Sequence, residues 1–430
     1  MRKIWLTLAV ILAAALSAGL AGAEEASSIN AGCAFSVRGA TRKQIRTLTD
    51  DKYSTYISIR AGGEIGIDLK GQAAGSILLQ FYDRPTQTEV RALVGQEWVT
   101  VAARGAYLSD WVELPEGAAS LKVVNTSRAR LMMAELTVFG TGDRPDRSPE
   151  WQDCGKADLM VFACHPDDEL LWLGGLLPTY AGERGLSVMV VYAVPSTPVR
   201  RLELLDGLWH CGVTNYPAFM NLPDRRSNTL AAAYKHWSKN RMCQMETGFI
   251  RQYRPEVVVT HDLNGEYGHG GHRAVADTVR LSVGYAADAS RYAASAGEYG
   301  TWQVKKLYLH LYAENQIQLD WHTPLARFGG RDGMTVATEA LAMHRSQVAN
   351  GWAMEEGGAC DNTLFGLCLT AVGPDEAGDD LFEHILPGRQ SNEPEDDPLE
   401  YEDLTDAEWP EATDLTEDDI TETIDLTEDT

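Results

Sequence analysis

The chain has 430 residues, of which 44% are hydrophobic and 23% charged, and its formal net charge is −25. A length of this order predicts about two domains of roughly 100 to 200 residues each. The acidity is concentrated in residues 391–430, which contain 18 acidic side chains and no Lys or Arg and leave −7 for the rest of the chain. Because nucleic-acid binding requires a cationic surface, this charge balance excludes a nucleic acid as the expected partner.

Residues 1–23 have the pattern of a secretory signal peptide. Arg2 and Lys3 precede a long apolar stretch that ends in Ala21-Gly22-Ala23, which predicts cleavage before Glu24. An uncleaved membrane anchor is the alternative, and the small residues at the end of the stretch favour cleavage. No later stretch of the sequence is long and apolar enough to predict a membrane span. We therefore expect a secreted or extracytoplasmic protein.

Residues 30–140 predict a β-sandwich of the jelly-roll type. Short apolar or alternating runs, separated by turn-forming residues, are typical of such a domain. These runs lie at 64–69, 76–82, 98–101, 120–124 and 134–140. Residues 141–153 follow as a linker rich in Pro and Asp.

Residues 154–386 change to an alternation of apolar strands and helical patterns. The predicted strands are 158–164, 186–194, 256–261 and 305–312, and the predicted helices are 168–185, 199–212, 245–254, 272–287 and 338–347. This alternation predicts an α/β fold of the Rossmann-like kind, with a mainly parallel sheet and helices on both faces.

Residues 387–430 are predicted to be a disordered tail. A motif beginning Asp-Leu-Thr recurs at Asp403, Asp414 and Asp425, each 11 residues after the last. Charge density is too high and apolar content too low for these repeats to form a packed core.

Two polar segments follow predicted strands. "HPDDE" (165–169) comes after the first strand, and "HDLNGEYGHGGH" (261–272) comes after the third. Open α/β sheets bind ligands beyond the carboxyl ends of their strands, so we expect these segments to meet in one crevice. Taken alone, the first segment fits a helix cap and the second a glycine turn with incidental histidines. Their occurrence at equivalent strand ends favours a site.

These segments contain the side chains of a catalytic zinc centre, which needs three His or carboxylate ligands and one open position. His165 and Asp168 lie three residues apart across a turn stiffened by Pro166, and His272 can supply the third ligand. Asp167 then remains free to accept a proton from the attacking water. His269 is placed to stabilise an oxyanion or to protonate the leaving amine.

The motifs "CHPDDE" and "GEYGHGGH" make residues 157–386 resemble the PIG-L/LmbE family of zinc-dependent N-deacetylases, whose pattern is Ala-His-Pro-Asp-Asp-Glu followed by Gly-x-Tyr-Gly-His-x-x-His. The resemblance implies His165, Asp168 and His272 as zinc ligands and Asp167 as the base. It implies His269 as the group that stabilises the oxyanion or protonates the leaving amine. It further implies that Tyr267 helps to hold the oxyanion and that Arg200 and Asp224 contact the sugar. For Arg200, a helix ion pair with Glu203 is the alternative.

Two positions depart from the family pattern. Cys164 replaces the usual Ala, and its side chain is expected to point away from that of its neighbour and thus from the metal. Gly270-Gly271 replaces a common Pro-Asp. The second change is expected to remove a carboxylate that supports a metal ligand, and so to weaken zinc binding.

The N-terminal region resembles the discoidin, or galactose-binding-like, domains through "LTDDKYSTYIS" (48–58) and "AELTVFG" (134–140). This resemblance implies a structural calcium ion with Asp50 and Glu135 as candidate ligands. An ordinary turn aspartate and a strand-edge glutamate are the alternative.

The sequence as a whole predicts an exported zinc hydrolase that removes the acetyl group from an N-acetylglucosamine-type sugar or glycan. A zinc amidase acting on a non-sugar amide, and a glycan-binding protein without catalysis, are the alternatives. Export would permit disulfides, and Cys360 with Cys368 is the nearest candidate pair.

Overall fold

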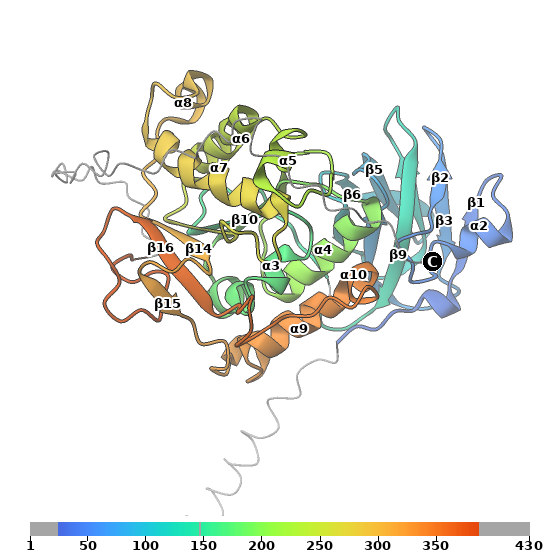
Figure 1. Cartoon of the computed structure of the whole chain (residues 1–430). Coiled ribbons are helices and arrows are strands. Elements are labelled where there is room, and N and C mark those ends of the chain that lie inside the picture. Colours follow the sequence, from blue (N-terminus) through green and yellow to red (C-terminus); the bar gives the residue numbers. More distant parts are fainter. Residues whose placement is uncertain (1–24, 146–147, 387–430) are drawn as a thin grey trace, which may run out of the picture. The chain divides into compact units, whose positions relative to one another are not determined.

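The computed structural model describes residues 25–145 and 148–386 (Figure 1). The predicted signal peptide and the acidic tail lie outside the described residues. Within these residues, no helix has both the length and the apolar character needed to cross a membrane.

The N-terminal region contains two antiparallel sheets. Inward-facing residues such as Ile65 and Ile67 on one sheet and Ile77 and Leu79 on the other are fully or almost fully buried and belong to one apolar core. The five-stranded sheet has the order β1 (Ala34–Val37), β3 (Glu64–Asp68), β8 (Ala118–Asn125), β5 (Thr88–Val94), β6 (Glu97–Arg104). The four-stranded sheet has the order β2 (Ile57–Ile59), β9 (Leu131–Gly140), β4 (Ala74–Phe81), β7 (Ser109–Glu113). Two short helices, η1 (Asn30–Gly32) and α2 (Arg42–Arg46), accompany β1.

The C-terminal region is built on one seven-stranded sheet. Five strands are parallel, and β16 and β15 are antiparallel additions at one edge. The order is β12 (Ala218–Phe219), β11 (Val188–Tyr192), β10 (Leu159–Ala163), β13 (Val257–Thr260), β14 (Lys306–His310), β16 (Leu364–Thr370), β15 (Gln316–Gln318). The central strands read as unbroken apolar runs because both of their faces are covered. The predicted, mainly parallel sheet is confirmed. The structure adds the two antiparallel strands, β16 and β15, at one edge of it.

Helices cover both faces of the sheet, as Figure 1 shows around β10. Val161 of β10 shares a core with Leu204 on α4, whereas its neighbour Phe162 shares a second core with Val275 on α7. The helices are α3 (Asp168–Leu171), α4 (Pro198–His210), α5 (Leu230–Tyr234), α6 (Lys239–Tyr253), α7 (Gly270–Ala287), α8 (Ala293–Tyr299), α9 (Gly333–Met343) and α10 (Arg345–Val348), with a π-helical turn η2 (Pro178–Glu183) and a 3-10 turn η3 (Ala326–Phe328).

Two predicted helices are interrupted. The helix expected over 168–185 ends at Leu171, and η2 begins only at Pro178. Gly174 between them has φ 57°, a left-handed conformation that does not continue a helix, and a Cβ there would lie 2.7 Å from Trp321 Nε1. The helix expected over 338–347 is divided into α9 and α10 at His344, whose backbone is not helical and whose side chain is fully buried.

Candidate active site

The two motif segments lie next to each other at the carboxyl ends of adjacent parallel strands. "HPDDE" follows β10 and runs into α3, and the segment 261–272 follows β13 and ends in the first turn of α7. The apolar strands fix the position of both loops because the sheet register pairs Val161 with Val259. The expected convergence of the two segments is confirmed.

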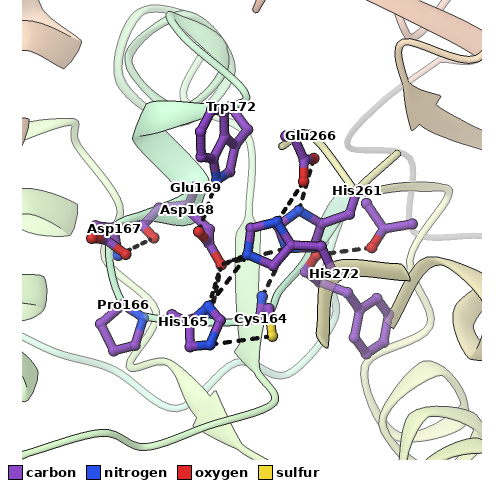
Figure 2. A network of polar contacts seen from close by, with 12 residues as sticks. Cys164, His165, Pro166, Asp167, Asp168, Glu169, Trp172, His261, Glu266 and His272 are labelled. Atoms are coloured by element: carbon purple, nitrogen blue, oxygen red, sulfur yellow. Dashed lines mark hydrogen bonds and ion pairs between the residues drawn. The ribbon is translucent and has the colours of Figure 1, made fainter. Parts of the chain in front are cut away.

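Three donor atoms of these loops form a small triangle (Figure 2). His165 Nδ1 lies 3.1 Å from Asp168 Oδ2, His272 Nε2 lies 3.3 Å from the same oxygen, and the two nitrogens are 3.4 Å apart. Ligands at about 2.0–2.1 Å from a tetrahedral zinc ion would be about 3.3 Å from one another. The donor set and its spacing therefore fit one such ion.

Hydrogen bonds to neighbouring groups orient two of these donors. Trp172 Nε1 donates to Asp168 Oδ1 at 2.8 Å and leaves Oδ2 directed at the triangle. His272 Nδ1 lies 2.5 Å from Glu266 Oε2, which places the proton on Nδ1 and leaves the lone pair of Nε2 free. Although burial opposes it, the attraction of His272 and His165 holds the pKa of Asp168 far below its usual range. Asp168 is therefore ionised.

Glu266 is a functional residue that the sequence reasoning missed. Its carboxylate contacts His272 through one oxygen and His261 and His310 through the other, at 2.9 and 3.2 Å. It supports His272 from a different position of the loop than Gly270-Gly271, so weaker zinc binding from those two glycines stays a prediction. Its place in "GEYGH", six residues before the ligand His272, is the only signal for it in the sequence.

His261 was also missed, although it directly follows β13. Its Nε2 lies 3.6 Å from Asp168 Oδ2, and Asp168, His261 and His272 form a group of donor atoms that could hold a metal ion. However, His261 Nε2 accepts a hydrogen bond from the Cys164 backbone N–H at 2.8 Å. With that lone pair in use, His165 is the better third ligand, and His261 braces the loop after β10.

Asp167 points away from the triangle and contacts Arg200. Arg200 Nη2 donates to Asp167 Oδ1 at 2.8 Å and to the Pro166 carbonyl oxygen at 2.5 Å, while the Asp167 N–H donates to Glu169 Oε2 at 2.9 Å. Asp167 has φ 118°, a strained value for a residue with a side chain, at a cost of about 1–3 kcal/mol. These hydrogen bonds hold the strained turn in place.

Burial, with the nearby Asp168 carboxylate, raises the pKa of Asp167 to about 7, against the opposing effect of Arg200. A carboxyl group that titrates near neutrality is suited to proton transfer. The structure thus brings Arg200 to the predicted base rather than into the helix pair with Glu203, whose carboxylate accepts hydrogen bonds from Ser346.

A cavity of about 400 Å³ opens over these residues. Seven predicted site residues line it, and the eighth, His272, is fully buried beneath. Asp224 Oδ1 lies 4.0 Å from His165 Nε2. Burial, together with His272 and His165, lowers the pKa of His269 to about 3, so this imidazole is neutral. Burial also raises the pKa of Tyr267, which keeps its phenol protonated. The seven lining residues are His165, Asp167, Asp168, Arg200, Asp224, Tyr267 and His269.

The two departures from the family pattern are neighbours in space. A Cβ at Gly271 would lie 2.9 Å from Cys164 Sγ, so the glycine makes room for the sulfur. The sulfur lies 3.7 Å from His165 Nε2, the ring nitrogen on the far side from Asp168, and within 4.8 Å of donor atoms of His269 and His272. Burial raises the pKa of the Cys164 thiol well above its usual value, so it is a neutral thiol here.

Other predicted positions lie away from this cavity. Glu135 Oε1 accepts a hydrogen bond from the Lys52 N–H, and burial raises the pKa of Glu135 to about 8, with Asp50 adding to the effect. The two candidate calcium ligands are thus neighbours, and the ion itself stays a prediction. The candidate pair Cys360 and Cys368 forms no disulfide: all seven cysteines are free, and the Cys360 thiol donates to the Glu266 carbonyl oxygen at 3.2 Å.

The chain is similar to several proteins that are named as deacetylases. Residues 160–282 match the family model described as PIG-L: GlcNAc-PI de-N-acetylase. A 1D-myo-inositol 2-acetamido-2-deoxy-alpha-D-glucopyranoside deacetylase of Segniliparus rotundus is 44% identical over 227 residues, covering 44% of this chain and 67% of that protein. The enzyme of that name (deacetylase 1) from Frankia casuarinae is 26% identical over 43% of this chain and 70% of its own length. N,N'-diacetylchitobiose deacetylase from Pyrococcus horikoshii is 18% identical over 44% of this chain and 71% of that chain, with a TM-score of 0.35.

A parallel sheet with histidine and carboxylate donors at the ends of two strands defines a metal-dependent hydrolase of the α/β class. The chain belongs to the PIG-L family, whose members are metal-dependent deacetylases acting on N-acetyl amides. It spans 60 to 70% of the length of the first curated relatives it matches.

Proposed function

We propose that the protein is an exported, zinc-dependent deacetylase of N-acetylglucosamine-type sugars or glycans. The observation that carries this proposal is the triangle of His165, Asp168 and His272 donors at a cavity that the Arg200-bound Asp167 carboxyl group also lines. The names of the relatives, which describe deacetylases of 2-acetamido-2-deoxy-glucose compounds, support the choice of an amino sugar.

Zinc held by the three donors would supply Lewis-acid polarisation of the amide carbonyl and acidification of the attacking water. Asp167 accepts the proton of that water, and Arg200 orients its carboxylate through Oδ1. His269 and Tyr267 line the same cavity as the reacting carbonyl and can donate hydrogen bonds to the oxyanion.

The proton for the leaving amine comes from Asp167 in this mechanism. Of the two roles predicted for His269, its low pKa favours hydrogen bonding as a neutral imidazole over proton donation as an imidazolium. Asp167 carries a proton after the first step and faces the same cavity. Its return to the nitrogen completes the release of acetate and a free amine.

The N-terminal region has a separate role in this proposal. We assign it as a galactose-binding-like domain that attaches the enzyme to glycan and holds a structural calcium ion through Asp50 and Glu135. The two antiparallel sheets with a common core support this domain type, and the signal-like residues 1–23 support export.

The activity is tested by measuring acetate release from N-acetylglucosamine, its oligomers, and N-acetylated amides without a sugar. Release from the sugars supports the proposal, and release from the non-sugar amides alone would replace it with a general amidase. Binding of sugars without any release would indicate a glycan-binding protein.

The two aspartates test the site itself. Asp167→Asn should keep zinc and lose activity by about 100-fold or more, because an amide cannot accept the proton. Asp168→Asn, the matched control, should lose zinc instead. Metal content by mass spectrometry and turnover are measured for both variants. Loss of zinc in Asp167→Asn with retention in Asp168→Asn would reverse the two roles.

A further inference from the structure

Three aromatic side chains line the cavity, and the proposed mechanism uses only one of them, Tyr267. Trp352 and Tyr267 are 37% and 50% exposed, whereas Trp172 is buried. Their ring centroids lie 5.3 Å apart for Tyr267 and Trp352, 5.6 Å for Trp172 and Tyr267, and 6.1 Å for Trp172 and Trp352. All three line the cavity above the metal triangle. We call these three residues the aromatic wall.

Two residues of the aromatic wall contact the proposed metal ligands. Trp172 donates its indole N–H to Asp168, and the Tyr267 ring lies 5.4 Å from the ring of His272. Trp352, which follows α10, packs against both. A group resting on the exposed part of Trp352 therefore adjoins whatever is bound at the triangle.

The remainder of the cavity is polar. Asp224 lies beside His165, and Arg226 lines the same cavity. Large aromatic surface left exposed next to charged groups is typical of a binding site rather than of a packed core. A pyranose ring matches this combination, because its C–H face is apolar and its hydroxyl edge is polar. An acyl chain would leave the charged groups without partners.

We propose that Trp352, with Tyr267, forms a stacking subsite for a second sugar ring next to the N-acetylated ring that reacts. Trp352 is then a specificity-determining residue, and the substrate is a glycan of at least two rings. This inference rests on the proposed sugar deacetylase function and narrows its substrate class.

The test compares the full chain with the Trp352→Ala and Trp352→Phe variants, each loaded with zinc. Acetate release is measured for N-acetylglucosamine and for its β-1,4-linked trimer, and the result is the ratio of the two kcat/KM values. Trp98→Ala is the matched control, because Trp98 on β6 is 42% exposed and lies outside the cavity. Trp352→Ala should lower the trimer-to-monomer ratio by about 3- to 10-fold, the scale of one aromatic contact, and Trp352→Phe should restore part of it.

An unchanged ratio in Trp352→Ala, or an equal fall in Trp98→Ala, would overturn the subsite. Binding separates this outcome from failure of the deacetylase proposal. Calorimetry with the trimer is carried out on Asp167→Asn and on the same variant with Trp352→Ala added. Weaker binding in the double variant supports the subsite even if no sugar is deacetylated. Equal binding, or no binding of the trimer to Asp167→Asn, overturns it.

Discussion

The Arg200 contact makes a quantitative prediction about pH dependence. Arg200 donates to Asp167 at 2.8 Å, and both side chains are largely buried, so solvent screens their attraction only weakly. An arginine beside an aspartate lowers the pKa of that carboxyl group by about 1–3 units. In Arg200→Ala the pKa of Asp167 should rise by this amount from its value of about 7. At pH 7, the ionised fraction should fall from about one half to about one tenth or less.

The sign of the effect follows from the role of Asp167. The base acts in its ionised form, so activity rises as pH increases through the pKa, and a higher pKa moves the acidic limb of the profile to higher pH. A bound cation lowers the pKa in wild type and variant alike, so the difference between the two profiles is the quantity to measure. The assay is kcat/KM between pH 5 and pH 10, with the melting temperature as a check on folding.

The neighbouring Arg201→Ala on α4 is the matched control, because Arg201 does not line the cavity. Its profile should overlie that of the wild type. An acidic limb that stays in place in Arg200→Ala, with activity lower by the same factor at every pH, would refute the reasoning. Arg200 would then act on the substrate and not on the base.

Two further predictions concern the groups around the metal ligands. Glu266→Gln should weaken zinc binding by about 10- to 100-fold, because the amide has one acceptor oxygen and its NH2 group would face the N–H of His272 or of His261. An unaltered affinity in equilibrium dialysis would count against this support. Gly271→Ala should destabilise the fold by about 1–3 kcal/mol in urea unfolding, since its Cβ meets Cys164 Sγ. The loss should shrink in a Cys164→Ala background, and equal losses in both backgrounds would contradict the proposed contact.

The sequence could predict the strands and the position of the two loops because both depend on local patterns. Apolar runs such as 159–163 predict buried parallel strands, and the spacing of the polar residues that follow them predicts a metal site. The meeting of His165 with His272 then follows from the order of the parallel strands, since β10 and β13 are neighbours.

What could not be predicted depends on contacts between distant segments. Gly174, in the break after α3, has no room for a side chain because Trp321 approaches it from well over a hundred residues away. Trp352 reaches the cavity from the segment after α10, where no periodicity points to a site. Glu266 stood in a recognised motif, but a carboxylate that supports a histidine has no spacing rule of its own, so its role became visible only with His261 and His310 beside it.

The question raised by "HPDDE" is why a chain would place three acids in succession, and the answer lies in their separate surroundings. Asp168 faces two imidazoles and an indole N–H, which hold it ionised. Asp167, turned away by its positive φ, faces Arg200 in a buried position, and its pKa rises to about 7. Glu169 is fully buried, burial raises its pKa to about 8, and it accepts the Asp167 N–H. Adjacent carboxyl groups whose pKa values are driven apart can divide ligand and base between them. The strained backbone at Asp167 separates the two environments. Glu169 holds that backbone through its hydrogen bond, and it thereby allows Asp168 and Asp167 to take the separate roles of ligand and base.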